Sequence, residues 1–162
     1  FEIAHRAPPD ILSARIVATL ARARKCSRPK GSPQMTRATI GSISPFFIVR
    51  DVSATIAFYE SRLGFKTSFR QPQDKPFFAI VERDGAMIFL KSGEAAPQPN
   101  ATRDPEMRWD AYCFTPDPDA LAAEFAERDA PFSRPLNDTT DGLRGFEITD
   151  PDGYVLFFGR PR

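Results

Sequence analysis

From Ile43 onward, apolar and polar positions follow the spacings of regular secondary structure. Residues 45–49 form a run of aromatic and β-branched residues, which is typical of a strand. Between Asp51 and Gly64, apolar residues recur every three or four positions, which predicts a helix that Asp51 caps and Gly64 ends. Three strands are expected after this helix, over 65–70, 76–83 and 86–91.

The second half of the chain repeats this order. We expect a strand over 108–115, a capped helix over 116–129, a loose segment around 131–136, and strands over 143–149 and 154–159. The Asp-Gly pair at 84–85 is a strong hairpin signal, and the turn sequence at 150–153 is its counterpart. The pattern therefore predicts an α+β protein in which a strand–helix–three-strand unit is duplicated.

This duplication sets the expected domain organisation. A single domain is expected over 41–162, with module one at 43–91, a linker at 92–106 and module two at 107–160. Residues 1–34 hold seven Lys and Arg against two Asp and Glu, so we expect residues 1–40 to be a basic leader, disordered or weakly helical. A targeting or membrane-surface segment is the alternative for this leader.

Charge and reactive side chains narrow the possible functions. The rest of the 162-residue chain holds 15 Lys and Arg against 19 Asp and Glu, and this mildly acidic body argues against a nucleic-acid partner. No apolar stretch approaches the roughly 20 residues of a membrane span. The single histidine, His5, lies in the leader, which excludes sites that need two histidines. Cys26 and Cys113 form no disulfide framework, which favours a reducing, cytoplasmic compartment.

Strand alternation indicates which side chains share the sheet face that no helix covers. In the first hairpin we expect Phe89 opposite Ile80, and in the second Phe157 opposite Phe146. Phe89 and Phe157 each lie four residues beyond a turn glycine, so they hold equivalent positions in the two modules. By the same alternation Trp109 is expected on the other face, packed against a helix or a subunit. An inert core thiol, Cys113, is expected beside it.

Two motifs near opposite ends of the domain resemble one known superfamily. The first comprises Val49-Arg50-Asp51-Val52, Phe58-Tyr59 and Leu63-Gly64-Phe65, and the second runs over 142–153 and ends in Asp-Pro-Asp-Gly. Both are similar to motifs of the vicinal oxygen chelate superfamily, which includes glyoxalase I, extradiol dioxygenases, fosfomycin-modifying enzymes and bleomycin-resistance proteins. The resemblance covers about residues 40–160 and implies that two βαβββ modules form a curved mixed sheet with a concave cleft. It does not specify a function, because unrelated activities share this scaffold.

Metalloenzymes of this superfamily take one metal ligand from each of four strands. The resemblance carries these four positions onto Ser44, Phe89, Asp110 and Phe157. A phenyl ring has no lone pair, and one carboxylate cannot hold a divalent transition metal by itself, so we expect a metal-free protein without a cofactor. The resemblance is then closest to the bleomycin-resistance branch, although Asp141 and Gly145 replace the tryptophan and the glutamate of that branch's motif.

The expected ligand site is mainly aromatic with a few polar groups, as small-molecule pockets are. Its predicted residues are Ser44, Phe46, Phe78, Phe89, Asp110, Tyr112, Phe114, Arg144, Phe146 and Phe157. Asp110 is either the counter-ion of a cationic ligand or the partner of Arg144 across the sheet. The phenylalanines either line an open cleft or fill it, and the sequence leaves both possibilities open.

These expectations favour a protein that sequesters an aromatic ligand, cationic or not, such as an antibiotic. The resemblance further implies a homodimer. One alternative is a lyase, isomerase or dioxygenase-like enzyme of the same superfamily that uses Asp110, Arg144 and Tyr112 as acid–base groups without a metal. The other is an interaction module whose cleft is vestigial.

Overall fold

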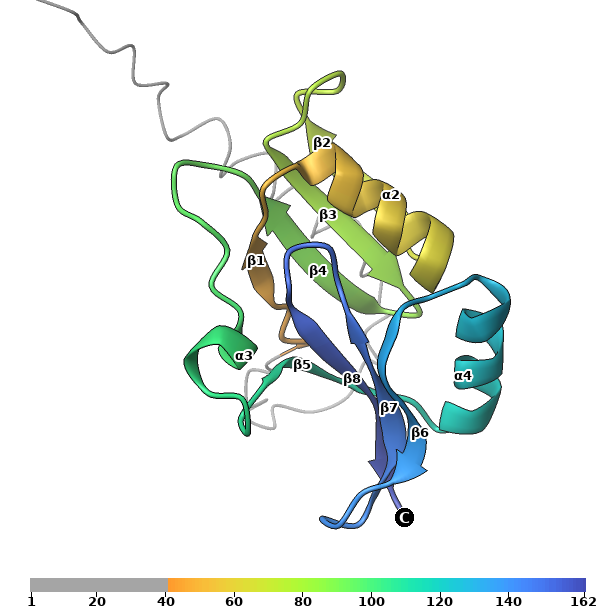
Figure 1. Ribbon diagram of the computed structural model, residues 1–162. Coiled ribbons are helices and arrows are strands. Elements are labelled where there is room, and N and C mark those ends of the chain that lie inside the picture. The colour runs from red at the N-terminus through yellow and green to blue at the C-terminus, as the bar shows by residue number, and fades with distance from the viewer. Residues whose placement is uncertain (1–40) are drawn as a thin grey trace, which may run out of the picture. The chain divides into compact units, whose positions relative to one another are not determined.

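The computed structural model describes residues 41–162 and contains the expected duplication (Figure 1). The expected leader lies outside the described residues. Module one consists of β1 (Phe46–Ile48), α2 (Val52–Leu63), β2 (Lys66–Gln71), β3 (Phe78–Arg83) and β4 (Ala86–Lys91). Module two consists of β5 (Trp109–Phe114), α4 (Pro118–Glu127), β6 (Phe132–Asp138), β7 (Leu143–Thr149) and β8 (Val155–Pro161). The linker between them contains a short helix, α3 (Asn100–Arg103), which the sequence pattern did not predict.

Each module forms its own four-stranded mixed sheet. The strand orders, β1-β4-β3-β2 and β5-β8-β7-β6, are the same. In each sheet the first strand pairs in parallel with the last strand of its module, and the other pairs are antiparallel. The α+β class and the duplicated unit are therefore confirmed. The segment around 131–136, expected to be loose, is instead part of β6, which pairs with β7 through an irregular register.

The two long helices begin at the predicted caps. Asp51 accepts hydrogen bonds from the backbone N–H groups of Ser53 and Ala54, and Asp117 accepts one from Ala120. Gly64 ends α2 with a φ of +68°, a conformation that costs a glycine little. No helix among residues 41–162 is long and apolar enough to span a membrane.

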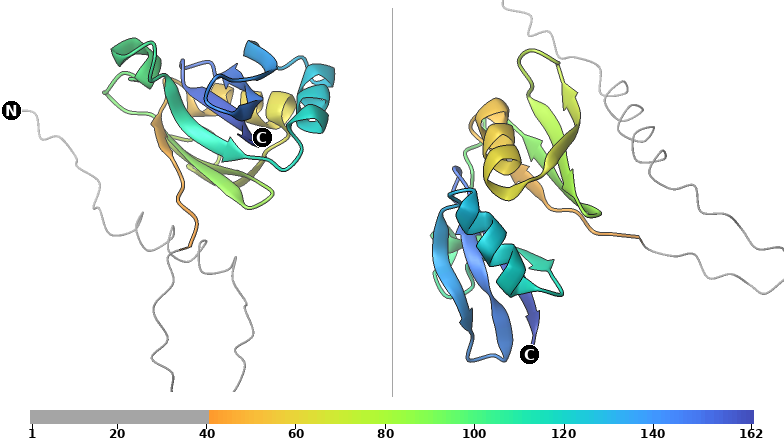
Figure 2. Two further views of the ribbon diagram at one scale, coloured as in Figure 1. Left: turned by 90° about the horizontal axis from the view of Figure 1, so that it is seen from below. Right: turned by 90° about the vertical axis from the view of Figure 1, so that its right-hand side faces the viewer.

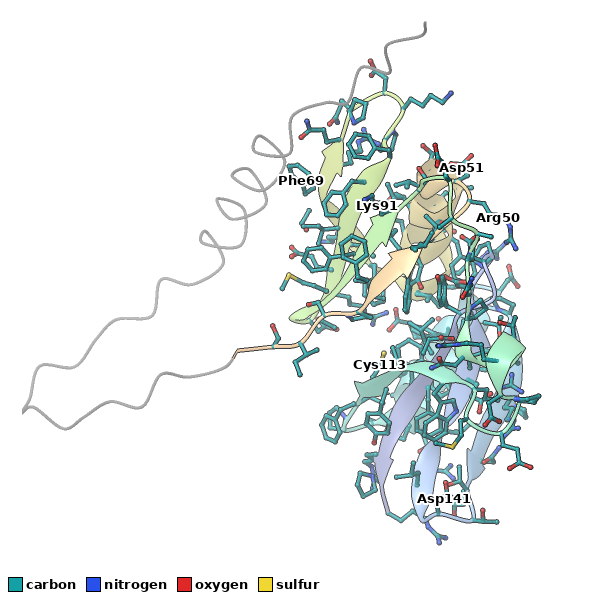
Figure 3. The ribbon with its side chains drawn as sticks, turned by 90° about the vertical axis from the view of Figure 1, so that its left-hand side faces the viewer. Arg50, Asp51, Phe69, Lys91, Cys113 and Asp141 are labelled. Atoms are coloured by element: carbon teal, nitrogen blue, oxygen red, sulfur yellow. The ribbon has the colours of Figure 1, made fainter. Side chains whose placement is uncertain are left out.

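One helix covers one face of each sheet, and the main apolar core lies between the helices and the sheets (Figure 2). On this face, Tyr59 and Leu63 of α2 and Phe125 of α4 are fully buried. The opposite face, called the second face below, carries a different set of side chains. In module one these include Phe46, Phe69, Phe78, Ile80 and Phe89, and in module two Trp109, Tyr112, Glu147 and Phe157. Figure 3 shows the side chains of both modules, with Phe69 and Cys113 labelled.

The two hairpins differ in turn length, and this difference decides which residues share a face. The first has the two-residue turn Asp84-Gly85, with both φ angles positive, so Phe89 pairs with Ile80 as predicted. In the second hairpin, the backbone N–H of Asp150 donates a hydrogen bond to the carbonyl of Tyr154, which leaves a three-residue turn over 151–153. Phe157 therefore pairs with Glu147, and the predicted pairing with Phe146 is wrong. A shift of one residue moves a side chain to the other face of the sheet.

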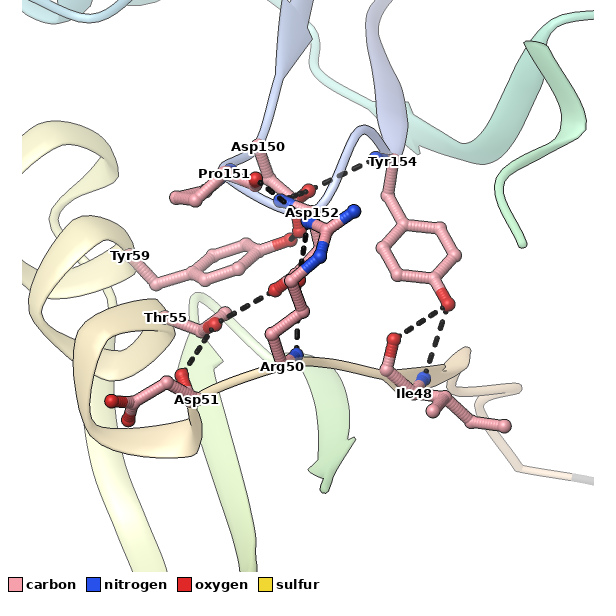
Figure 4. A network of polar contacts seen from close by, with 9 residues as sticks. All are labelled: Ile48, Arg50, Asp51, Thr55, Tyr59, Asp150, Pro151, Asp152 and Tyr154. Atoms are coloured by element: carbon pink, nitrogen blue, oxygen red, sulfur yellow. Dashed lines mark hydrogen bonds and ion pairs between the residues drawn. The ribbon is translucent and has the colours of Figure 1, made fainter. Parts of the chain in front are cut away.

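A polar network joins the turn of the second hairpin to the start of α2 (Figure 4). Asp152 is 6% exposed, and its Oδ1 accepts hydrogen bonds from the backbone N–H and the guanidinium of Arg50. Its Oδ2 accepts a hydrogen bond from the hydroxyl of Thr55. The Asp-Pro-Asp-Gly turn thus fixes module two against module one, which explains why the two motifs in the sequence lie together in space.

Candidate functional site

The candidate site is a hollow of about 720 Å³ on the second face of module two. Four strands and the turn between β6 and β7 contribute to its wall, including Asp141 in that turn (Figure 3). The residues that matter most for chemistry are Arg108, Trp109, Arg134, Glu147 and Phe157. Small-molecule pockets typically have about 300–1,000 Å³, so the hollow has the size for one such ligand.

Three stacked aromatic rings form the apolar part of this site. The ring centroids of Trp109 and Phe157 are 4.2 Å apart with an interplanar angle of 25°, and those of Phe157 and Tyr112 are 5.5 Å apart with an angle of 28°. Trp109 and Phe157 border the hollow, and Tyr112 extends the stack toward an exposed part of β5. Such a stack is suited to a flat, unsaturated ligand.

Trp109 reaches this face because of an irregularity in β5. Trp109 pairs with Val155 and Ala111 pairs with Leu156, so Asp110 is an extra residue between them. The prediction that Trp109 lies on the helix-covered face is therefore wrong, because one extra residue reverses the alternation. Cys113 does lie on the helix-covered face, partly buried against the core, and burial raises its pKa to about 12.

Two glycines make room for the ring of Phe157. A Cβ built on Gly145 would lie 2.5 Å from Cζ of Phe157, and one on Gly159 would lie 2.7 Å from its Cε1. Position 145 is where the bleomycin-resistance motif has a glutamate, and here a side chain at 145 would meet both the ring of Phe157 and the backbone carbonyl of Phe158. Asp141 stands at the position of that motif's tryptophan and also borders the hollow. The indole in the wall of the hollow comes instead from Trp109, on β5.

Glu147 is the buried charge of the site, and the sequence prediction missed it. The residue is 2% exposed, and its Oε1 accepts a hydrogen bond of 2.7 Å from the indole Nε1 of Trp109. Its Oε2 lies 3.1 Å from Nε of Arg108 and 3.6 Å from Nε of Arg134. A buried carboxylate persists only when it is paired, and here two guanidinium groups pair with it. The correct hairpin register would have identified it, since Glu147 is opposite Phe157.

The predicted aromatic residues of module one form a separate cluster. Centroid distances of 5.9–6.1 Å connect Phe46, Phe69, Phe78 and Phe89. Phe78 is 1% exposed, whereas Phe46 is 56% exposed. These rings pack on one another, so module one matches the possibility that phenylalanines fill the second face.

Of the remaining predicted residues, Phe146 borders the hollow, and Asp110, Tyr112, Phe114 and Arg144 do not. The Oδ1 and Oδ2 atoms of Asp110 accept hydrogen bonds from the backbone N–H groups of Asn100 and Val155. The guanidinium of Arg144 binds Asp119 and Asp138, so the predicted pair of Asp110 with Arg144 does not form. Three further residues were also expected in the site. The hydroxyl of Tyr112 donates to the carbonyl of Gly159, Phe114 is 68% exposed, and the ring of Phe146 packs on Phe125, Phe132 and Phe158.

The residues at the superfamily's metal positions do not suit a metal ion. Ser44 precedes β1, the ring of Phe89 stacks on Phe46, and that of Phe157 stacks on Trp109. Asp110 uses both carboxylate oxygens on backbone N–H groups. Within residues 41–162 no three His, Cys, Asp or Glu side chains are grouped as metal ligands.

Comparison with known proteins places this architecture among characterised folds. The family model of the Glyoxalase/Bleomycin resistance protein/Dioxygenase superfamily matches residues 39–158. A search of curated proteins finds no significant match. Among solved structures, TioX from Micromonospora sp. ML1 is 18% identical with a TM-score of 0.58, over 75% of this chain and 100% of that one. The bleomycin-binding protein of bleomycin-producing Streptomyces verticillus, complexed with copper(II)-bleomycin, is 23% identical with a TM-score of 0.59, over 78% and 100%.

Proposed function

Because the chain belongs to the Glyoxalase/Bleomycin resistance protein/Dioxygenase superfamily, and because its hollow is built around an aromatic stack, we propose that it binds a flat aromatic small molecule and sequesters it. The observation that carries the proposal is the ring stack of Trp109, Phe157 and Tyr112 at a hollow of about 720 Å³. Sequestration requires affinity alone, and these groups supply apolar contact, ring stacking and a few polar partners.

An antibiotic is the proposed kind of ligand. Structures of bleomycin-binding proteins share the fold at 21–23% identity, a likeness that extends to the fold alone. The choice of an antibiotic therefore rests on the family and on the site. Bleomycin is the natural first compound to test.

Binding is proposed in preference to metal-free catalysis. The acid–base groups of the alternative, Asp110, Arg144 and Tyr112, are each engaged by neighbouring groups of the protein, and Arg144 lies on the helix-covered side. No step of proton transfer to a shared substrate can be built from them. We also propose that the protein works without a metal, since the four superfamily positions offer one carboxylate, already bonded to backbone.

A homodimer is proposed from the exposed apolar side chains of two edge strands. Phe46 of β1 is 56% exposed, and Tyr112 and Phe114 of β5 are 45% and 68% exposed. Light scattering on a size-exclusion column should give the mass of two chains, and Phe114→Glu should shift the protein toward one chain. A wild-type mass of one chain at all concentrations would contradict the proposal.

The two cysteines, with no disulfide framework, support a reducing, cytoplasmic location as a further proposal.

The experiment for ligand binding uses the single tryptophan of the chain as its reporter. Because Trp109 borders the hollow, its fluorescence should change on titration with bleomycin or with polycyclic aromatic compounds. Phe157→Leu should weaken binding by about two- to tenfold, since ring stacking contributes about 0.5–1.5 kcal/mol beyond buried area. Phe69→Leu, in the aromatic cluster of module one, is the matched control and should leave the affinity unchanged. Equal affinities of wild type, Phe157→Leu and Phe69→Leu would show that the ligand binds outside the hollow.

A further inference from the structure

We infer that the hollow of module two selects aromatic ligands that carry a carboxylate, and that Arg108 and Arg134 recognise this group. The inference rests on the proposed function and goes beyond it, because it assigns the charge and shape of the ligand. It also replaces the cationic ligand that the sequence suggested, whose expected counter-ion, Asp110, is occupied by backbone N–H groups.

The charge of the inner part of the site carries this inference. Two guanidinium groups lie within 3.6 Å of one carboxylate, that of Glu147, so the cluster has a net charge of +1. The hollow also borders two exposed carboxylates, Glu106 and Asp141, so the positive charge belongs to this inner cluster and not to the lining as a whole. The local positive charge beside the ring stack favours an anionic group at that point of the ligand.

Hydrogen-bonding capacity points the same way. Arg108 and Arg134 each approach Glu147 through Nε, which leaves the terminal nitrogens of both guanidinium groups for other partners. Among residues 41–162, neither guanidinium group donates a hydrogen bond to the protein. The buried Nε of Arg108 and Oε2 of Glu147 are close without being aligned for one. A guanidinium group presents paired N–H donors that match the two oxygens of a carboxylate.

The position of the rings fixes where the carboxylate must sit on the ligand. The indole of Trp109 donates to Oε1 of Glu147, so the ring stack and the charged cluster meet at one hydrogen bond. Arg134 reaches the cluster because β6 is irregular on both sides of it, with register shifts between Phe132 and Arg134 and between Arg134 and Asn137. A flat ligand on the stack would bring a carboxylate attached directly to its ring system to these arginines.

Three matched probes test the inference: naphthalene-2-carboxylate, the neutral naphthalene-2-carboxamide and the cationic 2-(aminomethyl)naphthalene. Isothermal titration calorimetry in a low-salt buffer free of phosphate and carboxylates gives the three affinities without interference from probe absorbance. The carboxylate should bind about tenfold tighter than the carboxamide, because hydrogen bonds to charged groups are the stronger ones. The cation should bind most weakly.

Variants then assign the preference to the arginines. Arg134→Gln, at a side chain that is 56% exposed, should remove the preference for the carboxylate and leave carboxamide affinity within about twofold. Arg70→Gln removes an exposed arginine of module one and should change nothing. Glu147→Gln removes the competing negative charge and should strengthen carboxylate binding, provided that circular dichroism shows a folded protein.

The possible failures are distinguishable. Equal affinities for carboxylate and carboxamide, or tighter binding of the cation, would overturn the inference and leave the proposed aromatic binding intact. A preference for the carboxylate that survives Arg134→Gln would remove Arg134 from the recognition. Absence of binding by all three probes and by bleomycin would overturn both the inference and the proposed function.

Discussion

Tyr59 of α2 donates a hydrogen bond from its hydroxyl to Oδ2 of Asp150, over 3.1 Å, and both residues are buried. The bond links the helix of module one to the turn of module two (Figure 4). Oδ1 of Asp150 accepts further hydrogen bonds from the backbone N–H groups of Asp152 and Tyr154. One carboxylate therefore organises the turn and fixes it to the helix of the other module.

Asp150 should make stability depend on pH. Burial raises its pKa to about 6, above the 3.8 of an exposed aspartate, although its hydrogen bonds oppose this shift. Between these values the folded protein binds the proton more tightly than the unfolded chain does, so its contribution to stability is complete below about pH 4 and is lost as the pH rises through 6. The loss should be about 3 kcal/mol, since one pKa unit corresponds to about 1.4 kcal/mol.

Urea denaturation between pH 4 and 7 measures this dependence as the difference in the free energy of unfolding between wild type and Asp150→Asn. The difference is needed because arginine neighbours lower the pKa values of Glu124, Asp119 and Asp138, which favours stability at higher pH. Asp74→Asn, at an exposed aspartate, serves as the control and should follow the wild-type profile. A constant difference between wild type and Asp150→Asn across this range would contradict the assigned pKa.

Tyr59→Phe should destabilise the protein by about 1–3 kcal/mol, because it leaves a buried carboxylate oxygen without its donor. Loss of that donor should also raise the pKa of Asp150 further, since the hydrogen bond favours the ionised form. Denaturation of the variant at pH 5 and pH 7 checks both effects, and the destabilisation should be larger at pH 7. Similar losses at both values would show that the hydroxyl acts independently of ionisation.

Gly145→Ala should destabilise the protein by about 1–3 kcal/mol, a cost typical of an overpacked site. The added Cβ would meet the ring of Phe157 at 2.5 Å and would also clash with the carbonyl oxygen of Phe158. In the background of Phe157→Ala, the cost of Gly145→Ala should be smaller but not zero, because the contact with the backbone remains. A double-mutant cycle of the two changes measures the coupling, and strict additivity would show that the ring does not require the glycine.

Cys113 should resist alkylation in the folded protein. Its pKa of about 12, raised by burial, leaves very little thiolate at pH 8, and the thiolate is the reactive form. Mass spectrometry of the peptide that contains Cys113, after treatment with iodoacetamide, should find it unmodified without urea and modified with urea. Rapid labelling in the absence of urea would mean that the core around β5 opens readily.

Arg144→Gln should leave ligand affinity unchanged. Strand alternation predicts Arg144 in the site, but its guanidinium binds Asp119 and Asp138, away from the ring stack. Titration of the variant with the same ligand as wild type checks this directly, with Arg134→Gln as the variant that should differ. A loss of affinity in Arg144→Gln would restore the predicted site and call for a different ligand position.

The sequence by itself determined most of the elements and their duplication, with α3 and β6 as the exceptions. Asp51, Gly64 and the Asp84-Gly85 turn act through their own backbone and nearest neighbours, so their caps and turn could be predicted from local chemistry. The resemblance of the two motifs to one superfamily was enough to identify the fold, which the match over residues 39–158 confirms.

Only the tertiary structure decided which side chains form the site. The extra residue at Asp110 and the three-residue turn after Asp150 each shift the alternation by one position. Neither shift could be predicted from the local sequence pattern. Together they bring Trp109 and Glu147 to the second face and remove Phe146 from it. Because strand side chains alternate with a period of two, a change of one residue is enough to exchange the contents of a pocket with those of the core.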